Sequence, residues 1–202
     1  MTKKDIKFFF QAIKDGDLGK VAGLINNNEE YLIVCNVSPP KKDDGQSGLQ
    51  VAFKTGNFDI AKLLIERGAD VNFIEKSAIN EWTAPVLHDS IRATIFNSYT
   101  LQKDTGIFDK AFALLQLLLD KKANPDALDS YGNNCLHRAI MDAKQMIEHP
   151  GTAGENNILL QQLRKVFKAL IEAGADPATA NEKRPAALSM IASFRLEGYQ
   201  LW

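Results

Sequence analysis

The sequence predicts an all-α solenoid, an array of helix–turn–helix units that stack side by side. The prediction rests on a segment that occurs three times with changes: KLLIERGADVN at 62–72, LLLDKKANPD at 117–126 and ALIEAGADP at 169–177. Each copy combines the apolar end of a helix with the turn that follows it. A chain that repeats such a unit buries its apolar faces by stacking the copies, which is typical of binding scaffolds.

Composition supports a single array that needs neither disulfides nor metal ions for stability. With 202 residues and 45% hydrophobic content, the chain can bury a continuous core without metals or disulfides. Cys35 and Cys135 stand far apart in apolar surroundings and are expected to be buried thiols, which favours a cytoplasmic location. The formal net charge of -1 disfavours a nucleic-acid partner unless basic residues cluster locally. The N-terminal apolar run at 8–10 is too short for a signal peptide or a membrane span.

The unit at 44–72 shows how each helix is expected to begin and end. Apolar residues at 49–53 predict a first helix after a turn at Gly45, and the pair Gly56–Asn57 separates it from a second helix at about 60–66. The second helix should end at Gly68, because glycine adopts the left-handed C-cap conformation without a side-chain penalty.

Two motifs give this pattern a family resemblance. The stretch GQSGLQVA at 45–52 followed by LLIERGADVN at 63–72 resembles an ankyrin repeat, and DSYGNNCLHRAI at 129–140 resembles the opening motif of the same repeat. The resemblance implies hairpin-like turns between the repeats. It also implies a concave surface, made by the turn tips and the first helices, through which the family usually binds other proteins.

Setting the motifs in register predicts one domain, 1–202, of four repeats and a partial one. We expect the repeats at about 5–36, 44–79, 80–128 and 129–180, with a partial cap at 181–202. The polar end of the first repeat suits a terminal unit that faces water.

The third and fourth repeats are too long. The equivalent turn residues Gly68, Lys122 and Gly174 lie about 50 positions apart, whereas the family's repeat takes about 33. The additions fall near 95–108 and 147–160, between the two helices of each repeat. Because apolar residues continue into them, we expect lengthened helices around longer loops, which could pack on each other. They are either tolerated insertions or a second binding edge.

Catalytic and metal-binding motifs are missing from the sequence. His88 and His137 occupy the same place in the opening motif, where the resemblance implies that the histidine ties its turn to the neighbouring turn by hydrogen bonds. No zinc-ligand spacing accompanies them or Cys135. His149 is expected to be a solvated loop residue. No nucleophile elbow or phosphate-binding glycine loop occurs, so we expect neither an enzyme nor a cofactor.

The family's binding face, carried over by register, selects a row of candidate partner-binding residues. Trp82 and Tyr131 are the most informative of them, because a large aromatic residue in a polar turn is either packed on a neighbouring turn or an interface hot spot. The loop at 37–45 is either a protruding finger or solvated. The full set is Asp43, Asp44, Gln46, Lys54, Glu81, Trp82, Arg92, Ser130, Tyr131, Asn133, Met141 and Asp142, with Lys14, Asp15 and Thr55 at its edge.

These observations favour a monomeric, non-catalytic module that binds another protein, and neither a nucleic acid nor a membrane. One variant is an inhibitor or immunity-type protein that blocks a toxin or an enzyme. A contrasting hypothesis is a small-molecule binder or enzyme whose site lies between the lengthened hairpins of repeats three and four, with Asp104, Asp109, Glu148, His149 or Glu155. A self-associating spacer is a third possibility.

Overall fold

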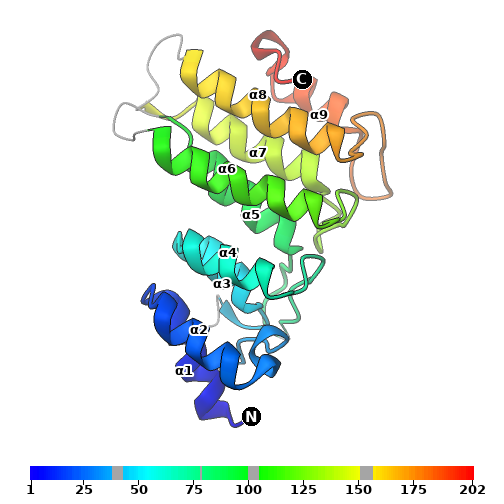
Figure 1. The fold of residues 1–202 in the computed structure, drawn as a ribbon. Coiled ribbons are helices and arrows are strands. Elements are labelled where there is room, and N and C mark those ends of the chain that lie inside the picture. Colours follow the sequence, from blue (N-terminus) through cyan, green and yellow to red (C-terminus); the bar gives the residue numbers. More distant parts are fainter. Residues whose placement is uncertain (38–42, 78, 100–104, 151–156) are drawn as a thin grey trace.

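Helices arranged in antiparallel pairs make up the computed structural model, which describes residues 1–37, 43–77, 79–99, 105–150 and 157–202. The pairs follow one another along the array in Figure 1, and a final helix closes it. They are α1 (Lys3–Lys14) with α2 (Leu18–Asn27), α3 (Gly48–Thr55) with α4 (Phe58–Glu66), α5 (Val86–Phe96) with α6 (Thr105–Asp120), and α7 (Cys135–Ile147) with α8 (Asn157–Glu172), followed by α9 (Ala187–Ser193). Short 3-10 helices lie at Glu29–Leu32 and Glu197–Tyr199.

The helices form two layers. The first helices of the pairs, α1, α3, α5, α7 and α9, contact one another in that order, and the second helices α2, α4, α6 and α8 form the other row. Within the described ranges, extended pairing is limited to two isolated bridges, Cys35 with Ser47 and Ile74 with Pro85. The predicted all-α solenoid is therefore confirmed. The repeat boundaries inferred from the motifs remain a proposal.

Local sequence explains where the helices begin and end. The Ser47 side chain accepts a hydrogen bond from the backbone N–H of Gln50, and the Gln50 side chain accepts one from the backbone N–H of Ser47, which completes a capping box at the start of α3. Gly68 follows α4 with φ +88°, so its predicted C-cap role is confirmed. Its counterpart after α6 is Lys122, which adopts φ +67° without being glycine.

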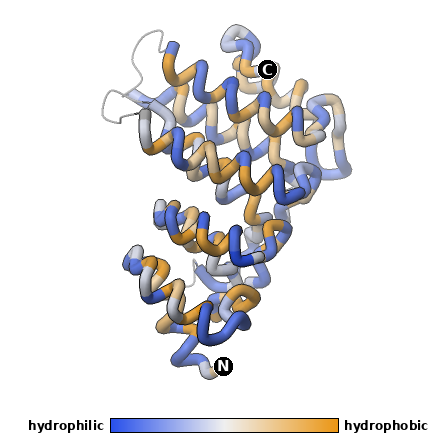
Figure 2. The backbone as a smooth tube through the Cα atoms, viewed as in Figure 1, coloured by the Kyte–Doolittle hydropathy of each residue, from blue (hydrophilic) through white to orange (hydrophobic). Residues whose placement is uncertain are grey.

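A single hydrophobic core runs along the whole array between the two layers. Hydrophobic and hydrophilic residues alternate along each helix in Figure 2, as expected for helices with one buried face. In the α3–α4 pair the core residues include Leu49, Phe53, Ile60 and Leu64, each at most 2% exposed. Each pair therefore depends on its neighbours to cover its apolar surface.

Backbone hydrogen bonds also join successive turns. The carbonyl of Gly45 accepts a hydrogen bond from the N–H of Lys76 (2.9 Å), and the carbonyl of Thr83 accepts one from the N–H of Ser130 (3.0 Å). One repeat further on, the Asn181 side-chain amide donates to the carbonyl of Gly132 (2.9 Å). These bonds fix the turn tips of neighbouring repeats relative to one another.

The long repeats contain lengthened helices, as predicted. Helices α6 and α8 have 16 residues each, against 9 in α4, so each is about 10 Å longer at ~1.5 Å rise per residue. The loop centres at 100–104 and 151–156, with Asp104 and Glu155, lie outside the described residues. The two extensions meet, because the N–H of Tyr99 donates to Gln162 Oε1 at 2.6 Å. Buried apolar residues of the core, among them Phe108, Leu159 and Leu163, occupy this region.

Replacing Leu64 with alanine should destabilise the array. Leu64 is 1% exposed and belongs to the shared core, so the lost contacts and the cavity should cost ~2–5 kcal/mol in the free energy of unfolding. Leu188→Ala is the matched control, because Leu188 is 48% exposed. Chemical denaturation of both variants measures the difference. Equal stability of the two would contradict the assignment of Leu64 to the core.

Replacing Gly45 with alanine should be more costly than the same change at Gly56. Both glycines have φ above +70°, but a Cβ at Gly45 would lie 2.1 Å from the backbone nitrogen of Ser77, whereas at Gly56 it would meet open space. Gly56→Ala should therefore cost ~1 kcal/mol from backbone strain alone. Gly45→Ala should cost at least about 2 kcal/mol more, because the neighbouring turn must move. Equal midpoints of thermal unfolding would show that the two turns do not stack as described.

Candidate functional site

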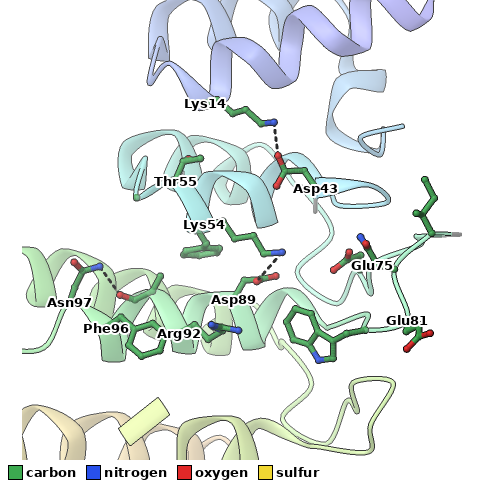
Figure 3. A pocket seen from close by; sticks show the side chains of 16 residues that line it. Lys14, Asp43, Lys54, Thr55, Glu75, Glu81, Asp89, Arg92, Phe96 and Asn97 are labelled. Atoms are coloured by element: carbon green, nitrogen blue, oxygen red, sulfur yellow. Dashed lines mark hydrogen bonds and ion pairs between the residues drawn. The ribbon is translucent and has the colours of Figure 1, made fainter. Parts of the chain in front are cut away.

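A groove of about 1250 Å³ is hollowed into the face that carries the first helices (Figure 3). Its walls come from α3, from α5 and from the segment that connects α4 to α5, with Lys14 of α1 at one end. The groove thus spans the first three helix pairs. Its charged and aromatic lining consists of Lys14, Asp43, Phe53, Lys54, Glu75, Glu81, Trp82, Asp89, Arg92 and Phe96.

Trp82 stands at the centre of the charged contacts in the groove. Its indole N–H donates to Asp129 Oδ2 at 3.1 Å, which fixes the ring against the next turn. Lys54 Nζ lies 5.8 Å from the ring centroid and Arg92 Cζ lies 6.0 Å from it, distances at which cations are attracted to the ring. Arg92 also lies over Phe96, with 5.5 Å between Cζ and the ring centroid. The half-buried indole is thus held by both the fold and its cationic neighbours.

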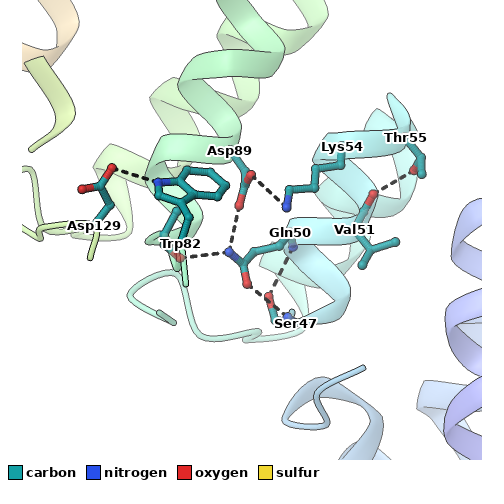
Figure 4. A network of polar contacts seen from close by, with 9 residues as sticks. Ser47, Gln50, Val51, Lys54, Thr55, Trp82, Asp89 and Asp129 are labelled. Atoms are coloured by element: carbon teal, nitrogen blue, oxygen red, sulfur yellow. Dashed lines mark hydrogen bonds and ion pairs between the residues drawn. The ribbon is translucent and has the colours of Figure 1, made fainter. Parts of the chain in front are cut away.

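A buried carboxylate, Asp89, organises the floor of the groove (Figure 4). Gln50 donates from Nε2 to Asp89 Oδ2 (2.8 Å) and to the carbonyl of Ala84 (3.1 Å), and Lys54 Nζ lies 3.8 Å from Asp89 Oδ1. Burial raises the pKa of Asp89, while the nearby Lys54 ammonium lowers it in part. Burial likewise raises the pKa of Glu75, and Asp89 adds to that shift.

The two signs of charge differ in their exposure. Asp89 is 2% exposed and Glu75 is 5% exposed, so both carboxylates lie beneath the surface. Lys54 is exposed and Arg92 is half-buried, so both cations reach the groove. At the end near α1, Lys14 Nζ and Asp43 Oδ2 pair at 2.6 Å. A molecule in the groove would meet cations and aromatic surface before it met these floor carboxylates.

Of the residues predicted to contact a partner, six line the groove with a side chain that is at least partly exposed: Lys14, Lys54, Thr55, Glu81, Trp82 and Arg92. Four others are buried, so their side chains offer little surface to a partner, and a contact role for them stays a prediction. Asn133 donates to Asp129, and Asp142 accepts from Arg138 Nε at 2.9 Å. The buried residues are Asp43, Gln46, Asn133 and Asp142.

The remaining predicted residues lie outside the groove. Asp44 accepts a hydrogen bond from Ser77 Oγ, and Ser130 joins two turns by accepting from the N–H of Thr83 and donating to the carbonyl of Glu81. Met141 packs at the edge of the core. Tyr131 is 49% exposed on a turn tip, apart from the groove that holds Trp82. A contact role for these residues stays a prediction.

The sequence prediction missed the two buried carboxylates of the groove floor, Asp89 and Glu75. For Asp89 a signal was present, because it lies three residues before Arg92 and therefore on the same helical face. For Glu75 no comparable signal exists. It follows a turn, and its place depends on how its segment contacts the turn before α3.

The resemblance implied that His88 and His137 each tie a turn to the neighbouring turn, and the contacts of His137 fit that role. Its Nδ1 accepts a hydrogen bond from the N–H of Asn134, and its Nε2 lies 2.8 Å from the carbonyl of Pro185 in the next turn. His88 is fully buried, and neither of its ring nitrogens has a well-aligned hydrogen bond within the described residues. His149 is exposed. Burial raises the pKa of the Cys135 thiol, which opposes reactivity.

Neither a metal site nor a membrane-spanning helix is present among the described residues. The described part of the chain contains no group of three or more His, Cys, Asp or Glu side chains placed to hold a metal ion. None of its helices combines the length and the apolar character that crossing a membrane requires.

Comparison with known families matched two segments of the chain. The model of the ankyrin repeat matches residues 44–76, which hold α3 and α4. A second model, described as ankyrin repeats in many copies, matches residues 107–143, which hold most of α6 and α7. Repeats of this kind are in general non-catalytic modules for protein–protein interaction. No curated protein matches the chain.

Acidification should weaken the fold through His88. Burial lowers the pKa of His88 from 6.5 to about 4, so between these pH values the unfolded state binds a proton that the folded state does not. The free energy of unfolding should therefore fall by about 3 kcal/mol from this residue as the pH drops from 6.5 to 4. Glu75, Asp89 and Asp142 act in the opposite sense, because their raised pKa values mean that the folded state takes up protons first.

The variant His88→Gln separates these contributions, because Gln50 occupies the same position of α3. Glu75, Asp89 and Asp142 are present in both proteins, so any change with pH in the difference between their unfolding free energies reports on His88. We expect the wild type to lose more stability than the variant between pH 6.5 and 4, measured by urea denaturation. Parallel pH profiles would show that His88 does not titrate differently in the folded state.

Proposed function

We propose that this chain, which is an ankyrin-repeat protein, binds another protein through the groove between α3 and α5. The observation that carries the proposal is Trp82, a large aromatic side chain half-exposed in the groove with Lys54 and Arg92 beside it. Tryptophan and arginine are enriched among the residues that contribute most to protein interfaces. The fold already determines the orientation of the indole, so little conformational entropy would be lost on binding.

The proposed role is that of a non-catalytic, monomeric, cytoplasmic module that acts by covering a surface of its partner. Blocking of a toxin or an enzyme is one form that such a role could take. A small-molecule or catalytic site between the long hairpins has less support, because the described residues that fill that region are mainly apolar. The groove near Trp82 is lined by charged and polar side chains as well as aromatic ones.

Affinity capture from a lysate of the source organism tests the proposal. Trp82→Ala should reduce capture of the specific partner by at least about tenfold, as expected for an interface hot spot. Trp202→Ala is the matched control, because Trp202 lies at the other end of the array against Phe167 and is 40% exposed. Trp82→Phe keeps an aromatic ring but loses the bond to Asp129, and so distinguishes loss of contact surface from loss of the turn–turn bond.

Tyr131→Ala, measured in the same assay, reports on the turn tips. If this variant captured less of the partner, the interface would extend beyond the groove to the turn tips. If every captured protein survived the Trp82→Ala change undiminished while the variant remained folded, the groove would not be the binding surface.

A further inference from the structure

We infer that the segment of the partner that enters the groove is acidic, and that its carboxylates are held by Lys54 and Arg92 beside Trp82. This inference rests on the proposed function and specifies the chemistry of the partner. It follows from three observations: the cations of the groove are more accessible than its carboxylates, Lys54 and Arg92 lie close together, and the next repeat has no cation at the equivalent position.

The two cations are presented together by neighbouring repeats. Each lies seven residues after the N-cap of its helix, Ser47 for α3 and Pro85 for α5, so stacking brings the same position of two adjacent helices side by side. Both side chains approach the Trp82 ring, at 5.8 and 6.0 Å from its centroid. Arg92 forms no ion pair within the described residues. One carboxylate could therefore contact both cations, or two neighbouring carboxylates one each.

The carboxylates of the floor do not cancel this preference at the surface. Glu75 and Asp89 are covered, and Asp89 already accepts a hydrogen bond from Gln50. Their burial raises their pKa values and so disfavours their charged forms. Asp43 is occupied by Lys14. Glu81 is the exposed acidic residue of the lining, and it stands on the segment before α5, away from the helical positions that carry the cations.

The site is short, which favours a protein segment over a nucleic acid. At the same position of α7, seven residues after Asn134, the chain has Met141 in place of a third cation. Affinity for nucleic acid requires several phosphate contacts along a basic track. Two cations next to Trp82 and the exposed side chain of Ile79 suit a segment in which acidic and apolar residues alternate.

The test uses labelled peptide pools as probes of the full chain. The peptides are about 12 residues long, and in the first pool Asp or Glu alternates with apolar residues. The second pool has Asn or Gln in place of the acidic residues, and the third has Lys or Arg in their place. A single-stranded DNA of similar length is the fourth probe. Fluorescence anisotropy measures binding at ~50 and ~300 mM salt, because screening weakens contacts between exposed charges. The acidic pool should bind on the order of tenfold more tightly than the amide pool at low salt and lose most of that advantage at high salt.

Variants locate the preference. Lys54→Gln and Arg92→Gln should each weaken binding of the acidic pool about fivefold to tenfold and leave binding of the amide pool unchanged. Lys62→Gln is the matched control, because Lys62 is an exposed lysine of α4 whose ion pair is with Glu66. Lys54→Arg and Arg92→Lys keep the charge and should retain most of the binding. A thermal melt of each variant excludes loss of folding.

The inference is overturned if the acidic and amide pools bind equally, including the case in which neither binds. It is also overturned if the basic pool or the DNA binds more tightly, or if both glutamine variants bind like the wild type. These outcomes differ from a failure of the proposed function. If Trp82→Ala abolishes capture from the lysate while the glutamine variants and salt have no effect, the groove binds a partner that is not acidic. If Trp82→Ala leaves capture intact, the groove itself is excluded.

Discussion

Burial of apolar faces between neighbouring helix pairs is the constraint on which the rest of the structure depends. The described helix pairs cover their apolar surfaces together, since one core, which includes Leu49 and Leu64, is shared along the whole array. Stacking determines which residues of successive repeats lie side by side. It therefore also creates the groove, because Lys54 of α3 meets Trp82 and Arg92 only when α3 and α5 are adjacent.

The charged network on the groove floor is a consequence of the same stacking. Burying Asp89 is unfavourable in itself, and the hydrogen bond that it accepts from Gln50 and its proximity to Lys54 offset that cost. Lys54 in turn is held near Trp82 instead of extending freely into water. The network thus orders a cation at the point where a partner would arrive. The turn–turn bonds, such as the one from Trp82 to Asp129, hold the aromatic ring beside it.

Features that depend on local sequence could be predicted, and features that depend on contacts between repeats largely could not. The left-handed cap at Gly68 and the lengthened α6 and α8 follow from residues within one segment. The burial of Gln46 does not, because the turn that carries it packs against the segment that follows α4, as the bond from the N–H of Lys76 to the carbonyl of Gly45 shows. Asp142 is an intermediate case, since Arg138 lies one helical turn before it and could have indicated an internal ion pair.

The same reasoning explains why only part of the candidate site was found. Lys54, Glu81, Trp82 and Arg92 were identified by their register in the repeat, and register is a property of one repeat at a time. Glu75 and Asp89 lie beneath the surface of the groove, where burial and neighbouring charges shift the pKa values of their carboxyl groups. Their role becomes apparent only when two repeats are placed together.

The chain contains two tryptophans, Trp82 in the groove and Trp202 at the C-terminal end, and their indole N–H signals in a ¹H–¹⁵N spectrum provide the most direct test of the groove as the binding surface. Single Trp→Phe variants assign the two signals. On addition of the captured partner, the account predicts that the Trp82 signal shifts or broadens while the Trp202 signal keeps its position. A change confined to Trp202, or binding that leaves both signals unaltered, would contradict it.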